Sequence, residues 1–250
     1  MQAIIMAAGR GSRLGNLTDD CPKAMLKVRG HRLIDYSLAL LHQNGIQDIK
    51  IVTGYHNEQY EALAEQIPGV TCIYNPFYEM FNVLGSFFMA QDKLSDEETI
   101  YMHADTLCDP EIFQDMVTAD GDIVLPVDFK HCDQEAMKVR TKDGKVIEIS
   151  KEIPESFGEG EFIGIAKLSA SVMPAIRQAA KKLLEQKQFK SYFEGAIQEV
   201  INQGGYTTPA IATEGRFWGE VDFLEDYQYV EDNISCSLRD IVEEYASVRR

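Results

Sequence analysis

Residues 3 to 14 read AIIMAAGRGSRL, an apolar run followed at once by two glycines and an arginine. The apolar part, Ala3 to Ala8, is far shorter than the roughly 18 residues of a membrane span and lacks the basic segment that opens a signal peptide. It therefore predicts a strand that is buried on both faces. Gly9 and Gly11 permit positive φ and a close approach to the backbone, so the loop after this strand can present N–H groups to a phosphate.

Two cations follow this loop. Arg13 can donate a fork of hydrogen bonds to phosphate oxygens, and Lys23, directly after Pro22, adds a compact positive charge. A dinucleotide-binding G-x-G-x-x-G loop would need glycine at position 14, which is Leu14, and the Gly-Lys-Ser/Thr of a Walker A loop is absent. A plain strand-to-helix turn is the alternative for an isolated Gly-x-Gly. The two cations favour a phosphate site.

Apolar runs alternate with segments of helical spacing through the first half of the chain. We expect strands at 3–8, 49–53, 70–74, 99–103 and 122–127, with helices from 34 to a stop at 44–45 and over 57–66, 83–94 and 110–117. This alternation predicts an α/β fold with a mainly parallel, doubly wound sheet. Ligands of such a sheet bind at the carboxyl ends of its strands.

Beyond about residue 128 the pattern predicts a β-rich insertion. Strands at 136–140 and 146–150 flank a turn at 142–145, and a third strand is expected at 162–168. Helices at 170–186 and 192–202, a strand at 206–212 and helices from 224 and 238 complete the chain. We expect one domain over 1–250, in which about 1–127 binds a nucleotide and about 128–250 forms a substrate flap and the C-terminal part.

The charge balance excludes whole classes of partner. The chain has 24 Lys and Arg against 40 Asp and Glu, a formal net charge of −16, so neither nucleic acid nor an anionic membrane is expected to bind. The five cysteines form no C-x-x-C pair, which is typical of reduced thiols and predicts a cytoplasmic location. The sequence leaves the oligomeric state open, a homo-oligomer included.

The motif Ala7-Ala8-Gly9-x-Gly11-x-Arg13, followed by Pro22-Lys23, resembles the signature of the nucleotidyltransferases that activate sugar phosphates and related phospho-compounds. The resemblance extends over nearly the whole chain and is most specific at its N-terminus. It implies a Rossmann-like fold, a nucleoside triphosphate bound over the glycine loop at Ala7, Ala8, Gly9 and Gly11, and release of pyrophosphate. It also implies that Arg13 and Lys23 contact the triphosphate.

A second segment, residues 74–86, resembles the part of the choline-phosphate and aminoalkylphosphonate cytidylyltransferases where N-x-x-x-S opens a helix near the nucleotide base. This resemblance implies that Asn75, Asn82 and Ser86 bind the nucleotide. Residues 136–139, 149–153 and 158–164 resemble the substrate flap of the same branch. Hexose 1-phosphate enzymes usually show Gly-Asp-Asn and Glu-Lys-Pro, where this chain has His-Ala-Asp at 103–105 and Ser-Lys-Glu at 150–152.

Three acidic residues are candidates to bind a metal. Asp105 follows a predicted strand at the edge where ligands bind, and Glu220 and Asp222 alternate along an extended segment, so their side chains face one side. Such hard oxygen ligands suit Mg²⁺. A helix N-cap is the alternative for Asp222, and its likeness to a late metal-binding Asp of the family favours the metal. His103 is interpreted as a packing residue and Cys108 as an inert thiol.

Taken together, these features predict a Mg²⁺-dependent enzyme, a cytidylyltransferase that uses CTP and a small zwitterionic phospho- or phosphono-amine, either 2-aminoethylphosphonate or phosphocholine. Lys138 and Lys151 are expected to neutralise the attacking anion. Acids at 128, 133, 135 and 161 favour a primary ammonium group, and therefore 2-aminoethylphosphonate. The alternatives are a sugar 1-phosphate nucleotidyltransferase that uses UTP or dTTP, and a catalytically silent nucleotide-sensing module, which would not require a metal pair.

Overall fold

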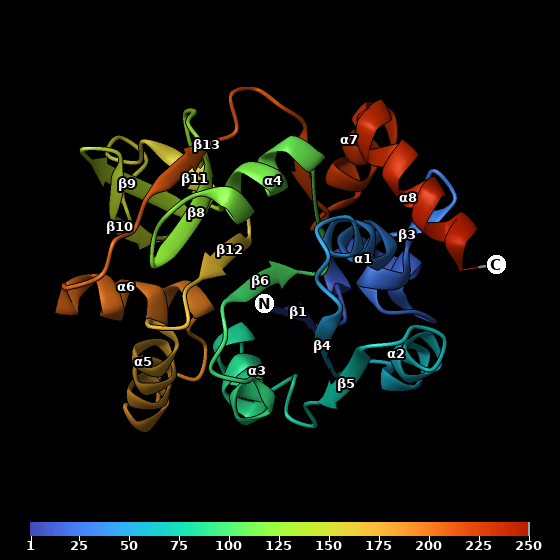
Figure 1. Cartoon of the computed structure of the whole chain (residues 1–250), viewed down its shortest axis with the longest axis horizontal. Coiled ribbons are helices and arrows are strands. Elements are labelled where there is room, and N and C mark those ends of the chain that lie inside the picture. Colours follow the sequence, from blue (N-terminus) through green and yellow to red (C-terminus); the bar gives the residue numbers. More distant parts are fainter. Residues whose placement is uncertain (250) are drawn as a thin grey trace.

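The first strand lies at the centre of the molecule. The structure is a computed structural model that describes residues 1–249, and β1 (Gln2–Ala7) is buried along its whole length (Figure 1). Ala3 and Ile5 pack into one hydrophobic cluster, whereas Ile4 and Met6 pack into another. Successive side chains of a strand point to opposite faces, so both faces of the sheet are covered, as the apolar run predicts.

Ten strands form one twisted sheet around β1. The others are β4 (Asp48–Thr53), β5 (Val70–Tyr74), β6 (Thr99–His103), β8 (Ile123–Asp128), β9 (Lys138–Lys142), β10 (Lys145–Ser150), β11 (Gly160–Phe162), β12 (Ile165–Leu168) and β13 (Ala210–Ala212). Their order is β10-β9-β11-β8-β12-β6-β1-β4-β5, with β13 beside β8. The segment β6-β1-β4-β5 is parallel, which confirms the predicted α/β sheet, and β12 joins it antiparallel to both β6 and β8.

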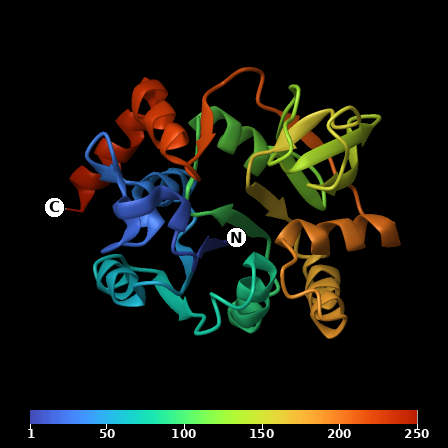
Figure 2. The same ribbon diagram turned by 180° about the vertical axis from the view of Figure 1, so that it is seen from behind.

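Helices cover the two faces in separate groups. One hydrophobic cluster takes in α1 (Leu33–Gln43), α2 (Asn57–Ala64), α4 (Pro110–Thr118), α7 (Leu224–Asn233) and α8 (Cys236–Val248). The other takes in α3 (Val83–Ala90), α5 (Met173–Glu185) and α6 (Phe193–Gln203). Figures 1 and 2 show α1 beside α8, and α5 beside α6 under the β-rich half. Within residues 1–249, no helix has the length and apolar character needed to cross a membrane.

The structure corrects several predicted boundaries. The strand expected at 162–168 is two strands, because Gly164 between them adopts φ +81°. The strand expected at 206–212 is only β13, and the helix expected at 83–94 ends at Ala90 before a short 3-10 turn. The sequence pattern did not predict two short strand pairs. These are β2 (Lys27–Val28) with β3 (His31–Arg32), and β7 (Thr106–Cys108) with β14 (Trp218–Glu220).

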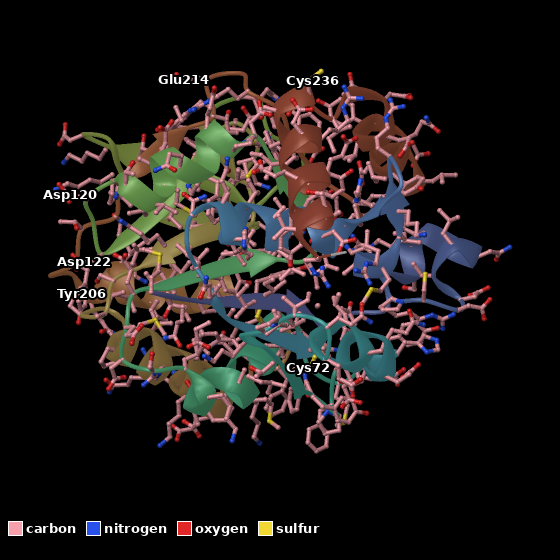
Figure 3. All side chains as sticks on the ribbon, turned by 45° about the vertical axis from the view of Figure 1, so that its right-hand side comes forward. Cys72, Asp120, Asp122, Tyr206, Glu214 and Cys236 are labelled. Atoms are coloured by element: carbon pink, nitrogen blue, oxygen red, sulfur yellow. The ribbon has the colours of Figure 1, made fainter. Side chains whose placement is uncertain are left out.

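Asp122, just before β8, joins three segments that are distant in sequence. Its carboxylate accepts hydrogen bonds from the N–H and the hydroxyl of Thr207 at 2.8 and 2.9 Å. It also accepts from the hydroxyls of Ser169 and Ser171 at 3.1 and 2.9 Å. Figure 3 shows Asp122 beside Tyr206 at the edge of the molecule. This carboxylate therefore ties the start of β8 to the turn before α5 and to the chain that leads into β13.

Candidate active site

A cavity of about 1080 Å³ opens at the carboxyl ends of β1 and β6. Its walls are the glycine loop after β1, the end of β6, the connection between β8 and β9, and the segment 215–223. Small-molecule sites usually measure about 300–1,000 Å³, so this cavity has room for a nucleotide and a second small molecule. The position is the one that the parallel strand order predicts.

The glycine loop packs directly against Lys23. Gly11 adopts φ +76°, and a Cβ at this position would lie 2.8 Å from the Lys23 Cβ. The Gly11 carbonyl accepts a hydrogen bond from the Thr18 hydroxyl at 3.1 Å. Ala7, Ala8 and Gly9 line the cavity beside Gly11. A side chain at position 11 would therefore disturb both the turn and the lysine behind it.

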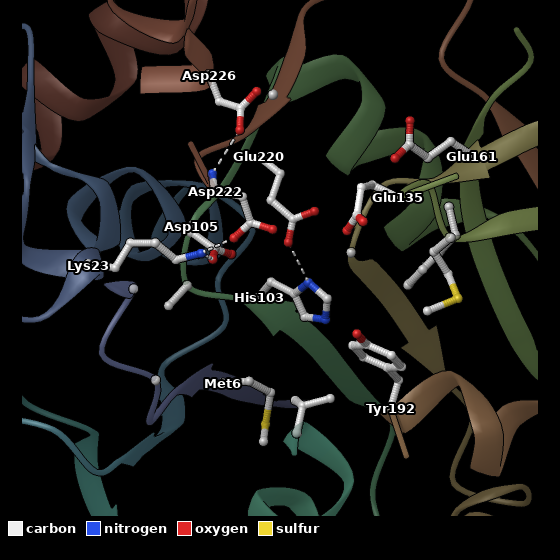
Figure 4. A pocket seen from close by; sticks show the side chains of 18 of the residues that line it. Met6, Lys23, His103, Asp105, Glu135, Glu161, Tyr192, Glu220, Asp222 and Asp226 are labelled. Carbon is white, nitrogen blue, oxygen red and sulfur yellow. Dashed lines mark hydrogen bonds and ion pairs between the residues drawn. The ribbon is translucent and has the colours of Figure 1, made fainter. Parts of the chain in front are cut away.

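Lys23 bridges two of the predicted metal-binding acids (Figure 4). Its Nζ pairs with Asp105 and lies 2.5 Å from Asp222 Oδ1, while Arg13 approaches Asp222 Oδ2 at 3.4 Å. Burial alone would lower the pKa of Lys23, but the charges of Asp105 and Asp222 outweigh it and raise this pKa above its usual range. Burial likewise opposes ionisation of Asp222, but Lys23 and Arg13 hold its pKa below the usual value. The pKa of Asp105 is raised instead, because its burial outweighs the charge of Lys23. Lys23 and Asp222 are therefore charged at neutral pH.

The donor set for a metal comes together through a strand pair that the sequence did not reveal. In the β7–β14 pair, Glu220 lies opposite Thr106, and the Val221 N–H donates to the Asp105 carbonyl at 3.2 Å. His103, Asp105 and Glu220 each offer one possible ligand atom, and these three atoms lie within 4.8 Å of one another. Asp105 Oδ1 is buried and has no hydrogen-bond partner among residues 1–249. An orphaned carboxylate oxygen beside a second carboxylate fits a hard divalent cation, whereas Asp222, the third predicted ligand, lies outside this group and pairs with Lys23.

His103 makes polar contacts with three side chains of the site, whereas the sequence suggested that it is a packing residue. Its Nδ1 lies 3.2 Å from Glu220 Oε1, and its Nε2 lies 3.0 Å from the Tyr101 hydroxyl and 3.6 Å from Glu194 Oε1. Burial would lower the pKa of His103, but the hydrogen bond to Glu220 and the charges of Glu220 and Glu194 raise it to about 9. The protonated ring therefore lies between two carboxylates.

Glu194, in the first turn of α6, is a candidate functional residue that the sequence did not suggest. It is 1% exposed and lines the cavity. In the described chain, neither of its carboxylate oxygens has a hydrogen-bond partner. Burial raises its pKa. An acid at the start of a helix is ordinary in sequence, because it complements the helix dipole, so no sequence signal set this one apart.

The two flap lysines have different surroundings. Lys151 lines the cavity, with its Nζ 5.0 Å from the centre of the Tyr192 ring and 3.8 Å from Glu135 Oε2. Lys138 is buried outside this cavity, and its Nζ donates to the backbone carbonyls of residues 133, 134 and 136 at 3.1, 3.3 and 3.2 Å. This geometry argues against the anion contact expected for Lys138, whose ammonium group holds the flap loop instead.

Of the three residues predicted to bind the nucleotide base, two line the cavity and one lies behind it. Asn82 and Ser86 line the cavity, and Asn82 also caps α3 by accepting the Val83 N–H at 2.8 Å. Asn75 is fully buried, and its Nδ2 donates to Ser86 Oγ at 3.0 Å. It therefore orients Ser86 from behind, which differs from the direct nucleotide contact that the resemblance implied.

Acids of the flap form the outer wall. Asp128, Asp133, Glu135 and Glu161 all line the cavity. Lys130 already pairs with Asp128 at 3.2 Å and with Glu161 at 3.0 Å, and its Nζ lies 4.6 Å from the centre of the Trp218 ring. Lys130 thus pairs with both of these acids, whereas Glu194 has no lysine or arginine partner among the described residues and faces only the His103 ring. Figure 4 shows Glu135 and Glu161 facing the cavity across from Asp105 and Asp222.

Comparison with known proteins places this geometry in a family context. Residues 3–194 match the family model described as the MobA-like NTP transferase domain. The chain is 26% identical to the CTP:phosphoglutamine cytidylyltransferase of Campylobacter jejuni, over 91% of this chain and 98% of that protein. It is 28% identical to the choline-phosphate cytidylyltransferase of Streptococcus pneumoniae, over 93% and 97% of the two chains. It is also 37% identical to the 2-aminoethylphosphonate cytidylyltransferase of Lancefieldella rimae, over 45% and 46%.

Solved structures agree with the sequence comparison. The structure of the CTP:phosphocholine cytidylyltransferase from Streptococcus pneumoniae superposes with a TM-score of 0.77 at 26% identity, over 92% of this chain and 97% of that one. The inositol-1-phosphate CTP transferase of T. maritima gives a TM-score of 0.74 at 20% identity, over 97% and 95%. This second likeness bears on the fold alone, which is the Rossmann-like fold that the N-terminal motif implied.

Proposed function

The chain belongs to the MobA-like NTP transferase family, and from this premise we propose that it is a Mg²⁺-dependent cytidylyltransferase that joins CMP to a small phosphorylated or phosphonylated amine. Family membership makes it a nucleotidyltransferase. The cytidylyl donor is supported by the relatives named above and by the likeness of residues 74–86 to their base-binding segment. One observation carries the proposal most directly: a cationic glycine loop, a cluster of metal-binding oxygens and a buried unpartnered carboxylate all face one cavity.

The triphosphate is assigned to the loop after β1. Gly9 and Gly11 leave the backbone N–H groups accessible, and Arg13 and Lys23 supply positive charge within an acidic protein. Both cations pair with Asp222 in the free chain, so they are held at the loop and can turn to the β- and γ-phosphates. Ser86 and Asn82 are assigned to the base.

The metal is assigned to Asp105, Asp222 and Glu220. Mg²⁺ prefers carboxylate and phosphate oxygens, and the unpartnered Asp105 Oδ1 offers such a ligand. When bound there, the ion supplies neutralisation of the negative charge on the phosphates. His103 has both ring nitrogens engaged by other side chains and is assigned no coordination.

In the transfer step, an oxygen of the acceptor's phosphoryl or phosphonyl group bonds to the α-phosphorus of CTP. The bond between that phosphorus and the bridging oxygen breaks, and pyrophosphate leaves with the electron pair. The attacking oxygen is already ionised, so no residue has to remove a proton. The residues therefore act by positioning and by neutralising charge, Arg13 and Lys23 at the leaving group and Lys151 at the attacking anion.

The acceptor's cation is assigned to the end of the cavity formed by Tyr192 and Glu194. Neither carboxylate oxygen of the buried Glu194 accepts a hydrogen bond from residues 1–249, which is costly, and an ammonium group offers the donors that it lacks. A quaternary ammonium group has no N–H to donate and favours a cage of aromatic rings instead. We therefore favour a primary amine, 2-aminoethylphosphonate, over phosphocholine.

A panel of substrates tests the proposal. Pyrophosphate release would be measured with CTP, UTP and dTTP, each against 2-aminoethylphosphonate, phosphocholine, phosphoglutamine and glucose 1-phosphate. We expect the highest kcat/KM for CTP with 2-aminoethylphosphonate. A site that pairs with the exocyclic group of cytosine rejects a base that lacks the matching donors.

Other outcomes separate the alternatives. Preference for phosphocholine or phosphoglutamine would change only the choice of amine. Faster turnover with glucose 1-phosphate and UTP or dTTP would establish the sugar nucleotidyltransferase. Binding of CTP without pyrophosphate release from any pair would identify a silent nucleotide-sensing module.

A further inference from the structure

His103 lies between the two ends of the cavity. On one side its Nδ1 contacts Glu220, which is assigned to the metal, and on the other its Nε2 faces Glu194, which is assigned to the acceptor. Glu220 is a pure acceptor when ionised, so Nδ1 carries the proton of this hydrogen bond. The two carboxylates would repel each other across the cavity without a donor between them.

The imidazole ring is held in place from two further directions. The backbone N–H of His103 donates to the Gly164 carbonyl at 2.9 Å, and a Cβ at Gly164 would lie 2.8 Å from the ring Nδ1, so Gly164 packs closely against the ring. The Tyr101 hydroxyl that contacts Nε2 belongs to a buried ring stacked on Phe193, with centroids 4.0 Å apart and planes 16° apart. Phe193 directly precedes Glu194, so one packed group fixes both the histidine and the carboxylate.

We propose that His103 is a positioning residue of the transfer reaction, which holds Glu220 toward Asp105 and keeps Glu194 turned toward the acceptor's cation. This inference rests on the proposed function, because that function assigns the two ends of the cavity. It joins the metal end and the acceptor end through one side chain. The sequence alone offers no reason to link residues 103, 194 and 220.

Kinetics of single and double variants test the role. We expect Glu194→Gln to raise the KM for 2-aminoethylphosphonate at least tenfold, with the KM for CTP within threefold of wild type. His103→Ala should raise the same KM and also lower kcat at least tenfold, because Glu220 loses its partner. In the double variant the acceptor KM should be no higher than in the worse single variant, since the two side chains act as a unit.

A conservative variant separates the two contacts. The amide of His103→Gln can still donate to Glu220 but cannot contact Glu194 at the same time, so it should recover kcat and leave the acceptor KM raised. His42→Ala, on an exposed histidine near the end of α1, is the matched control and should leave every parameter unchanged. If His103→Ala does not fold, the split between kcat and KM is measured on His103→Gln.

Three results would overturn the proposal: additive effects of His103→Ala and Glu194→Gln on the acceptor KM, equal effects of His103→Ala on the KM of both substrates, or loss of Mn²⁺ binding in His103→Gln, which would make the histidine a metal ligand. An NMR measurement on ¹⁵N-histidine-labelled protein tests the contact independently of turnover. The Nδ1 proton of His103 should be protected from exchange with solvent in the wild type and should lose this protection in Glu220→Leu. Unchanged protection in Glu220→Leu would refute the contact between His103 and Glu220. If no amine acceptor is used, the proposed function fails while this measurement still decides the contact.

Discussion

At Lys23, a single ammonium group serves two carboxylates and supports the glycine loop, so its removal should affect catalysis directly. We expect Lys23→Ala and Arg13→Ala each to lower kcat/KM for CTP at least tenfold, about 1.4 kcal/mol of transition-state stabilisation. Arg10→Ala is the matched control, because Arg10 belongs to the same loop but pairs with Asp19 at 3.0 Å, and both side chains are half exposed. Steady-state kinetics with thermal melts would check this. Near wild-type kinetics in folded Lys23→Ala would reduce the loop to a plain strand-to-helix turn.

The carboxylates make a second prediction at the same scale. Asp105→Asn and Asp222→Asn keep the shape of each side chain but remove the charge that a divalent ion needs, so each should lower kcat at least a hundredfold, about 2.7 kcal/mol. Calorimetry should show weaker binding of Mg²⁺ in both variants. Asp120→Asn, on an exposed acid that does not line the cavity, should behave as wild type. Full turnover in either site variant would remove that residue from the metal site.

The site could be predicted only where its residues adjoin a recognisable motif. Asp105 follows a buried strand, so its placement needs little beyond the rule that ligands bind at the carboxyl edge, whereas Arg13 and Lys23 belong to the motif that resembles the family signature. Glu194 gave no signal, because its function depends on burial beside His103, 91 positions earlier in the chain, a contact that only the packing of α6 creates. Lys138 was expected to contact the attacking anion, and a lysine on a flap is usually exposed. In the structure it is buried, and its ammonium group donates to three backbone carbonyls.

At the scale of elements, strands were easier to predict than their partners. Consecutive side chains of a strand point to opposite faces of the sheet. Because Ile4 and Ile5 are both apolar, the local sequence of β1 predicts a hydrophobic core on each face. The antiparallel insertion of β12 between β6 and β8, and the pairing of β7 with β14, depend on contacts between distant segments that no local pattern encodes. The β7–β14 pair brings Glu220 to Asp105, so the sequence suggested these two acids as metal ligands without revealing the strand pair that joins them.

Asp122 gives the prediction that belongs to this scale. The hydrogen bond from the Thr207 backbone N–H, with those from three hydroxyls, outweighs burial and lowers the pKa of Asp122. A lowered pKa stabilises the fold above the unfolded-state value, and this stabilisation is lost as the pH falls below about 4 and through the lowered pKa. Because solvent screens these mostly exposed hydrogen bonds, Asp122→Asn should cost only about 0.5 to 1 kcal/mol of unfolding free energy at pH 7, and less at pH 3.

Guanidinium titrations at the two pH values would measure this difference. Asp120→Asn, two residues away and exposed, is the control and should change the unfolding free energy little at either pH. An equal loss of stability at pH 7 and pH 3 would mean that Asp122 acts by shape and not by charge.

For the whole molecule, the decisive quantity is the net charge of −16, which opposes the approach of a nucleoside triphosphate. Two effects can offset this repulsion. Any salt screens it at distances beyond about 8 Å at physiological ionic strength, whereas a divalent ion between Asp105, Glu220 and the phosphates acts locally. These effects differ in their ion requirement, so they can be separated.

We expect EDTA to abolish pyrophosphate release completely, and excess Mg²⁺ to restore it, because a cluster of carboxylates without a divalent ion repels the phosphates that it should hold. KCl added to the same ionic strength should restore less than a tenth of the activity, since screening cannot bridge a carboxylate to a phosphate oxygen. Initial rates in the three buffers, with CTP and acceptor saturating, make the comparison. Activity that survives chelation, or that KCl restores as well as Mg²⁺ does, would show that Asp105, Glu220 and Asp222 serve only to hold Lys23 and His103 in place.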